Sequence, residues 1–130
     1  KNNSITIGLN IRIPVTIYIA LIKQKISDSI LDFSDISIKF DDEKVALFVP
    51  KTDSLVTTLC DVFNEVTGSK EEPITCPGAT YARALKNVVS FGCNMPGKLD
   101  MCHQADEFLD INDLLKSIEI FIKAIRKLTE

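Results

Sequence analysis

The stretch that decides the predicted fold is ITIGLNIRIPVTIYI, residues 5–19. Apolar side chains occupy every odd position from Ile5 to Val15, and the even positions carry threonine, glycine, asparagine, arginine and proline. A period of two predicts a β-strand with one buried face and one polar face. Pro14 has no N–H to donate, so the regular ladder should end there or run along a sheet edge.

The segments that follow this stretch predict a helix and two more strands. From Val15 to Ile26 the apolar spacing fits a helix better than a strand. Residues 36–40 (ISIKF) and 44–50 (KVALFVP) have strand-like composition, and the three acids at 41–43 form the turn between them. The N-terminal region should therefore be a strand–helix–strand–strand unit.

The rest of the chain favours a helix at each end. Asp53 or Ser54 can cap a helix by accepting a free backbone N–H, and Gly68 supplies a left-handed stop. Asp110 or Asn112 can cap the last helix, which carries a wide apolar stripe. The stripe consists of Leu114, Leu115, Ile118, Phe121, Ile122, Ile125 and Leu128.

Between these helices the sequence predicts two short buried strands and a long loop. The strands are PITC at 73–76 and NVVSFG at 87–92. Between them, residues 77–85 (PGATYARAL) are a glycine-containing turn that runs into a short helix. Residues 93–108 have no periodicity. The expected fold class is therefore α/β with mixed α+β character, in two parts at residues 1–47 and 48–130. Each part is too short for a complete two-layer domain.

Composition excludes several classes of function. The 130 residues are 45% hydrophobic and 25% charged, so a packed core is expected. A net charge of −3 without a Lys/Arg stripe gives no footprint for nucleic acid. No apolar run approaches the roughly 20 residues that span a bilayer. The four cysteines form no CxxC pair, and we interpret them as reduced thiols of a cytoplasmic protein.

His103, the single histidine, is a candidate ligand or acid–base group. It lies on a long loop, and such loops are often functional. The alternative is a surface histidine that contacts local backbone. Asp106 and Glu107 could orient the imidazole by accepting its N–H, or could be solvated acids near a helix start. A nucleophilic role for Cys102 is disfavoured, because no third group orients the adjacent histidine.

Two further segments could bind an anion. Arg12 and Asn10 share the polar face of the first predicted strand, and an arginine fork suits a carboxylate. The alternative is an exposed arginine on a half-solvated sheet. The turn at 78–80 (Gly78, Ala79, Thr80) lies between a predicted strand and a helix, where free N–H groups can cradle an anion. Arg83 could pair with an acid or be solvated.

Three motifs in fixed order resemble a known family. They are N-x-R-x-P at 10–14, a glycine turn followed by T-Y-A-R at 78–83, and H-Q-x-x-E at 103–107 after the Pro-Gly turn at 96–97. As a set they resemble the C-terminal end of peptidase V-type dipeptidases, which include the Xaa-His (carnosinase-like) dipeptidases. These enzymes belong to the zinc aminoacylase/carboxypeptidase metallopeptidase superfamily. The resemblance covers nearly the whole chain.

The resemblance implies a longer enzyme, in which a lid domain interrupts an α/β catalytic domain with two divalent metal ions. Residues 1–47 would be part of the lid and residues 48–130 the C-terminal part of the catalytic domain. The metals would be zinc, with manganese or cobalt as alternatives. The bridging aspartate and the general base would lie in the missing N-terminal part, so we expect the 130-residue chain to be inactive and to bind no metal tightly.

Individual residues take roles from the same resemblance. His103 matches the last metal ligand, with Glu107 and Asp106 behind it. Arg12 matches the lid arginine that binds the substrate's carboxylate, with Asn10 beside it. The 78–80 turn matches backbone that lines the substrate pocket, less closely.

Two departures and two alternatives accompany this interpretation. The turn before Thr80 is poorer in glycine than in the family, and Asp106 stands where asparagine is common. The implied substrate is a dipeptide. A deacylase or carboxypeptidase of the same superfamily, or a stand-alone interaction domain without catalysis, remains the alternative.

Overall fold

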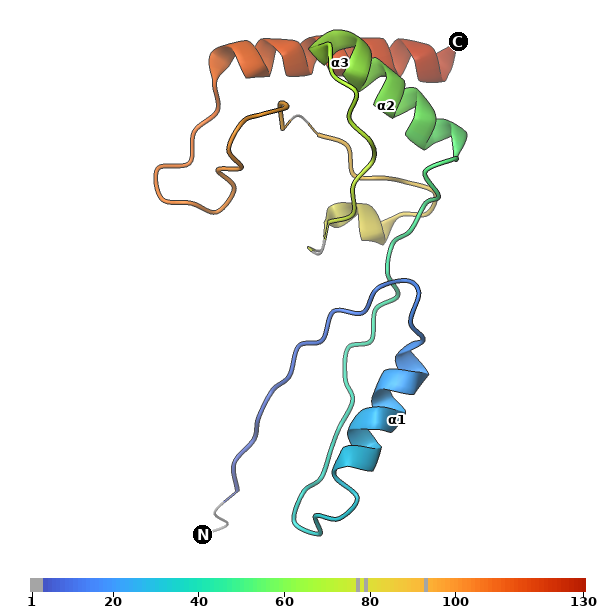
Figure 1. Cartoon of the computed structure of the whole chain (residues 1–130), viewed down its shortest axis with the longest axis vertical. Coiled ribbons are helices and arrows are strands. Elements are labelled where there is room, and N and C mark those ends of the chain that lie inside the picture. The colour runs from blue at the N-terminus through green and yellow to red at the C-terminus, as the bar shows by residue number, and fades with distance from the viewer. Residues whose placement is uncertain (1–3, 77, 79, 93) are drawn as a thin grey trace. The chain divides into compact units, whose positions relative to one another are not determined.

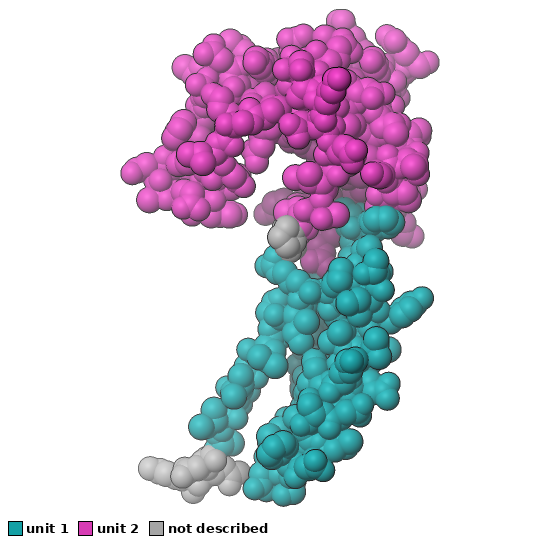
Figure 2. Space-filling model, viewed as in Figure 1, with its two compact units in different colours: residues 1–48 teal, residues 49–130 magenta. Residues whose placement is uncertain are grey.

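The computed structural model describes residues 4–76, 78, 80–92 and 94–130, which divide into two compact units. One unit is Lys1–Phe48 and the other is Val49–Glu130 (Figure 2). The assignment of these regions to a lid and a catalytic domain stays a prediction. Within the described ranges no helix is long and apolar enough to cross a membrane.

The predicted α/β fold is wrong for the part of the chain that the structure describes, because that part contains helices and no strand. The predicted strand segments at 5–15, 36–40, 44–50, 73–76 and 87–92 form no ladder there. A strand exists only when a neighbouring strand pairs with its backbone. Without that partner the apolar face stays in solvent, as Ile5 shows with 91% of its surface exposed.

The first unit contains a single described helix, α1 (Ile19–Ser29), which begins four residues later than predicted (Figure 1). A turn closed by Ile17 N–H donating to the Pro14 carbonyl occupies the intervening residues. Lys23 on α1 pairs with Glu43 and lies 5.2 Å from the centroid of the Phe40 ring. These contacts hold the extended segment that contains Phe40 and Glu43 against α1, although no residue of α1 is fully buried.

The second unit is built around α2 (Ser54–Thr67) and α3 (Ile111–Thr129), which pack against each other. The predicted caps are confirmed: Asp53 accepts from Leu55 N–H at 2.9 Å and Asp110 from Asn112 N–H at 2.8 Å. Gly68 ends α2 with a left-handed φ of 69°. A 3₁₀-helix, η1 (Tyr81–Ala84), stands where a short helix was predicted.

The core of this unit lies between α2 and α3. Ile120 and Val62 are fully buried and Ala124 is 3% exposed. The other core members are Leu59 and Met95. Phe91 meets Phe121 edge to face, with centroids 5.6 Å apart, and so joins the segment before the long loop to α3. The packing of these two helices therefore anchors both ends of the loop that carries His103.

The stripe predicted on α3 is not the face that forms this core. Ile120 and Ala124, which do not belong to that stripe, face α2, whereas the stripe residues Ile118 and Ile125 remain 48% and 61% exposed. An apolar arc wider than one contact face is typical of a helix with neighbours on two sides. Within the described residues, the face of α3 that carries Ile120 and Ala124 packs against a helix, α2, and the face that carries Ile118 and Ile125 has no partner helix.

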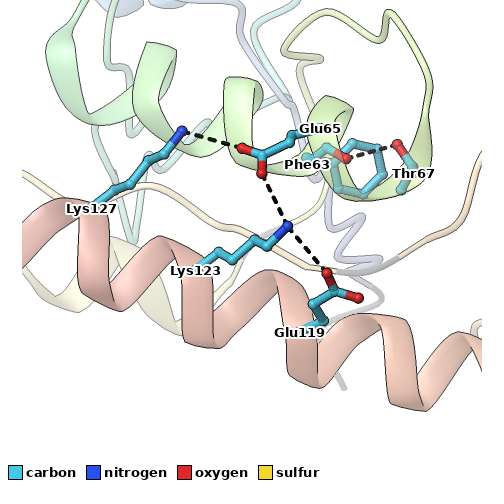
Figure 3. Close-up of polar contacts among 6 residues, drawn as sticks. All are labelled: Phe63, Glu65, Thr67, Glu119, Lys123 and Lys127. Atoms are coloured by element: carbon cyan, nitrogen blue, oxygen red, sulfur yellow. Dashed lines mark hydrogen bonds and ion pairs between the residues drawn. The ribbon is translucent and has the colours of Figure 1, made fainter.

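Glu65 on α2 links the two helices by charge (Figure 3). Its Oε1 lies 3.0 Å from Lys123 Nζ and its Oε2 3.3 Å from Lys127 Nζ, and Lys123 also pairs with Glu119 at 3.2 Å. Hydrogen bonds from Lys123 and then Lys127 lower the pKa of Glu65 below 4.5. The hydrogen bond to Glu65, followed by that to Glu119, raises the pKa of Lys123 above 10.5.

Replacing Glu65 with glutamine should therefore change how stability depends on pH. A lowered carboxyl pKa contributes stability that is present above pH 4.5 and is lost as pH falls through the folded-state pKa. A raised lysine pKa contributes stability that is present below pH 10.5 and is lost as pH rises through the folded-state pKa. Thermal unfolding across pH should show both losses reduced in Glu65→Gln, together with weaker dependence on salt.

The matched control is Glu71→Gln, which removes the same charge from a side chain outside this cluster. It should leave the acid side of the stability profile as in the unsubstituted chain. Equal profiles for Glu65→Gln and the unsubstituted chain would show that the ion pairs do not contribute to folding.

Candidate functional site

His103 lies in a tight turn within the loop between the Pro96-Gly97 turn and α3. Gln104 N–H donates to the Met101 carbonyl at 3.1 Å, which closes the turn. His103 has a φ of 63° and Asp106 a φ of 58°, so both adopt the left-handed conformation that is uncommon outside glycine. The side chain of His103 is exposed and is therefore available to a ligand.

The acids near His103 contact backbone. Glu107 Oε2 accepts from the backbone N–H of His103 at 3.2 Å, and Asp100 Oδ1 accepts from that of Cys102 at 3.0 Å. The predicted contact of Glu107 or Asp106 with the imidazole stays a prediction. Asp100 was not singled out by the sequence reasoning. Its signal was available in the Asp-Met-Cys spacing, since aspartate commonly bonds the N–H two residues ahead.

The environment of Cys102 disfavours a nucleophilic thiolate. A hydrogen bond from its thiol to Asp100, followed by the charge of Asp100, raises the pKa of the thiol above 9.0. Reactive cysteines depend on a lowered pKa, because the thiolate is the nucleophile. In return, the backbone hydrogen bond from Cys102 lowers the pKa of Asp100 below 3.8, which keeps this carboxylate ionised.

The other predicted site residues lie in both units. Arg12 and Asn10 are exposed on the extended segment of the first unit. In the second unit, Thr80 Oγ1 and Ser90 Oγ lie 2.8 Å apart and join the turn to the segment before the long loop. Gly78 N–H donates to Cys76 Sγ at 3.3 Å, and a Cβ at Gly78 would lie 3.2 Å from that sulfur. Ala79 lies outside the described residues.

A shallow depression of about 260 Å³ on the second unit does not coincide with these residues. Its lining is Lys51, Thr52, Thr57, Cys60, Asp61, Glu72 and Pro73. None of these was predicted as a site residue, and the Cys60 thiol is engaged with the Glu71 carbonyl at 3.1 Å. The depression therefore adds no catalytic group to the candidate site.

The described residues do not form a metal site by themselves. Among them, no group of three or more histidine, cysteine, aspartate or glutamate side chains could hold a metal ion. They offer one exposed imidazole on a turn held by carboxylates. The role of His103 as a metal ligand stays a prediction.

Comparison with known proteins gives the class. Residues 2–127 match the sequence profile of Peptidase family M20/M25/M40, and the chain belongs to this family. Peptidases of this family are generally metal-dependent. No solved structure matches the chain.

Curated relatives in this family carry dipeptidase names. The chain is 38% identical over 125 residues to "Putative dipeptidase YtjP" of Bacillus subtilis, an alignment that covers 95% of this chain and 26% of that protein. It is 35% identical over 83 residues to "Beta-Ala-Xaa dipeptidase" of Lactobacillus delbrueckii, covering 64% of this chain and 18% of that protein. The chain thus spans about a quarter or less of the length of these relatives.

Proposed function

We propose that these 130 residues are the C-terminal region of a longer metallodipeptidase of the peptidase V type. The observation that carries this proposal is the match over residues 2–127 to a peptidase family whose curated relatives are named as dipeptidases. The region would supply His103 as one metal ligand and Arg12 as a carboxylate-binding group. It would hold no general base, and the 130-residue chain alone would be inactive.

The metal contribution of this region is limited to one imidazole. A neutral imidazole suits zinc and also binds other first-row metals, so zinc is the proposed ion, with manganese or cobalt as alternatives. Bound divalent metals polarise a scissile carbonyl and lower the pKa of a bound water. The turn would hold the His103 ring in place as a metal ligand, and the exposed position of His103 on this closed turn supports the role.

The substrate contribution rests on Arg12, Asn10 and the 78–80 turn. A guanidinium binds a carboxylate with two parallel hydrogen bonds, so Arg12 would select peptides whose free C-terminus lies close to the scissile bond. Asn10 lies two positions away on the same exposed segment and can add a neutral donor. The turn would line the pocket with backbone groups, and the Thr80–Ser90 contact keeps it near the segment before the His103 loop. The partners would be a dipeptide and the N-terminal part of the same protein, in the cytoplasm.

Activity of the complete protein tests the proposal. The full-length enzyme should hydrolyse dipeptides, should lose activity with a chelator and should regain it with zinc, manganese or cobalt. N-acyl amino acids and longer peptides, assayed side by side, distinguish the alternatives. Faster turnover of N-acyl amino acids would indicate a deacylase, and release of C-terminal residues from long peptides would indicate a carboxypeptidase.

Replacing Arg12 with alanine should raise KM for dipeptides by about 10–100-fold, the value expected for one charged hydrogen-bonded pair. Dipeptide amides lack the terminal carboxylate, so their KM should change little. Arg12→Lys keeps the positive charge but lacks the planar guanidinium. Its KM for dipeptides should lie between those of the unsubstituted enzyme and Arg12→Ala. An equal loss for acids and amides would contradict carboxylate recognition by Arg12.

A further inference from the structure

Two neighbouring backbone amides in the His103 turn are each held by a carboxylate. Cys102 N–H donates to Asp100 from the N-terminal side, and His103 N–H donates to Glu107 from the C-terminal side. The turn bond from Gln104 N–H to the Met101 carbonyl spans both amides. Three successive N–H groups, of residues 102, 103 and 104, therefore have acceptors within eight residues of chain.

These bonds act on a backbone conformation that needs support. A histidine at φ 63° is in the left-handed region, which its Cβ disfavours. The turn is also exposed, so buried packing does not hold it. Local hydrogen bonds therefore stabilise the left-handed conformation of His103.

The kind of donor that each carboxylate contacts decides how it can act on the imidazole ring. Each acid accepts a hydrogen bond from a backbone N–H, and neither of these two bonds involves the imidazole. A contact to the ring would fix its tautomer, whereas a contact to the backbone fixes the direction of the Cα–Cβ bond. The turn thus sets the direction in which the imidazole leaves the chain.

We propose that Asp100 and Glu107 are positioning residues that hold the backbone of His103 in its left-handed conformation and so present its imidazole to the metal site. The inference rests on the proposed ligand role of His103 and adds Asp100 to the residues that serve it. Asp100→Asn and Glu107→Gln keep an acceptor oxygen, whereas the alanine variants remove it.

NMR of the full 130-residue chain tests the backbone part. A positive φ brings H–N and Hα of the same residue close together, so His103 should show a strong intraresidue cross-peak. In the double variant Asp100→Ala/Glu107→Ala this peak should weaken several-fold, and the Cys102 and His103 amide protons should shift upfield. The Asn/Gln double variant should retain the peak. An unchanged peak in the alanine double variant would overturn the inference.

Metal affinity of the full-length enzyme tests the positioning part. Asp100→Ala should weaken zinc binding by about 10–100-fold, as loss of a supporting partner commonly does, and Asp100→Asn should restore most of it. Asp32→Ala, an exposed acid of the first unit, is the charge-matched control and should bind zinc normally. Equal affinity of Asp100→Ala and the control would overturn the inference. Failure of the proposed function would give a different result. If His103 is not a ligand, the full-length His103→Ala variant should have the same metal content as the unsubstituted enzyme.

Discussion

Replacing Ile120 with alanine is expected to lower the free energy of unfolding of the second unit by about 2–5 kcal/mol. Ile120 has no exposed surface and lies at the centre of the contact between α2 and α3. Removing three carbons there takes apolar surface out of the core and leaves a cavity that the two helices can only partly close. Urea unfolding followed by circular dichroism measures the loss.

Ile125→Ala is the matched control for this prediction. The same substitution on the same helix removes a side chain that is 61% exposed, so the expected change is within about 0.5 kcal/mol. Both variants share the gain in helix propensity from isoleucine to alanine, which cancels in the comparison. Ile120→Val should cost about 0.5–1.5 kcal/mol and gives a graded result if the alanine variant does not fold. Equal losses at 120 and 125 would contradict the assigned core.

Removing the imidazole of His103 from the full-length enzyme should lower kcat/KM for dipeptides by more than about 100-fold. Loss of an outer partner of a metal ligand already costs about 10–100-fold, and loss of the ligand should cost more. His103→Gly is the sharper variant, because glycine fits a φ of 63° and leaves the turn intact. Added imidazole should then restore part of the activity and of the metal content.

Lys70→Ala, an exposed substitution in the same unit, should retain full activity. Thermal unfolding of His103→Gly should match that of the unsubstituted enzyme, since the lost ring is exposed. Full activity of His103→Gly without imidazole would show that this ring is not a ligand.

The sequence predicted helices better than strands, and the reason is local. The caps at Asp53 and Asp110 and the stop at Gly68 act within a few residues, so the bounds of α2 and the start of α3 could be identified from the chain alone. A strand needs a partner that is distant in sequence. The alternation from Ile5 to Val15 therefore favours pairing with another strand, but among the described residues no strand pairs with this segment.

The candidate site was partly predictable for a similar reason. His103 and Arg12 could be proposed because motifs place their residue types in order along the chain. The left-handed backbone of His103 was not predicted, because histidine gives no glycine-like signal for it. Asp100 and Glu107 lie two and four residues from the N–H groups that they accept from, and only the folded structure shows that these bonds go to backbone.

The left-handed residues at 103 and 106 also set which codon changes this loop can accept. Glycine and asparagine tolerate that region of φ and ψ, whereas β-branched side chains do not. In a saturation library, position 106 should accept Asn and Gly beside Asp, and should reject Val and Ile although neither is larger than many tolerated surface residues. Position 103 should have the same steric restriction. Selection for dipeptide hydrolysis should also require a ring nitrogen there.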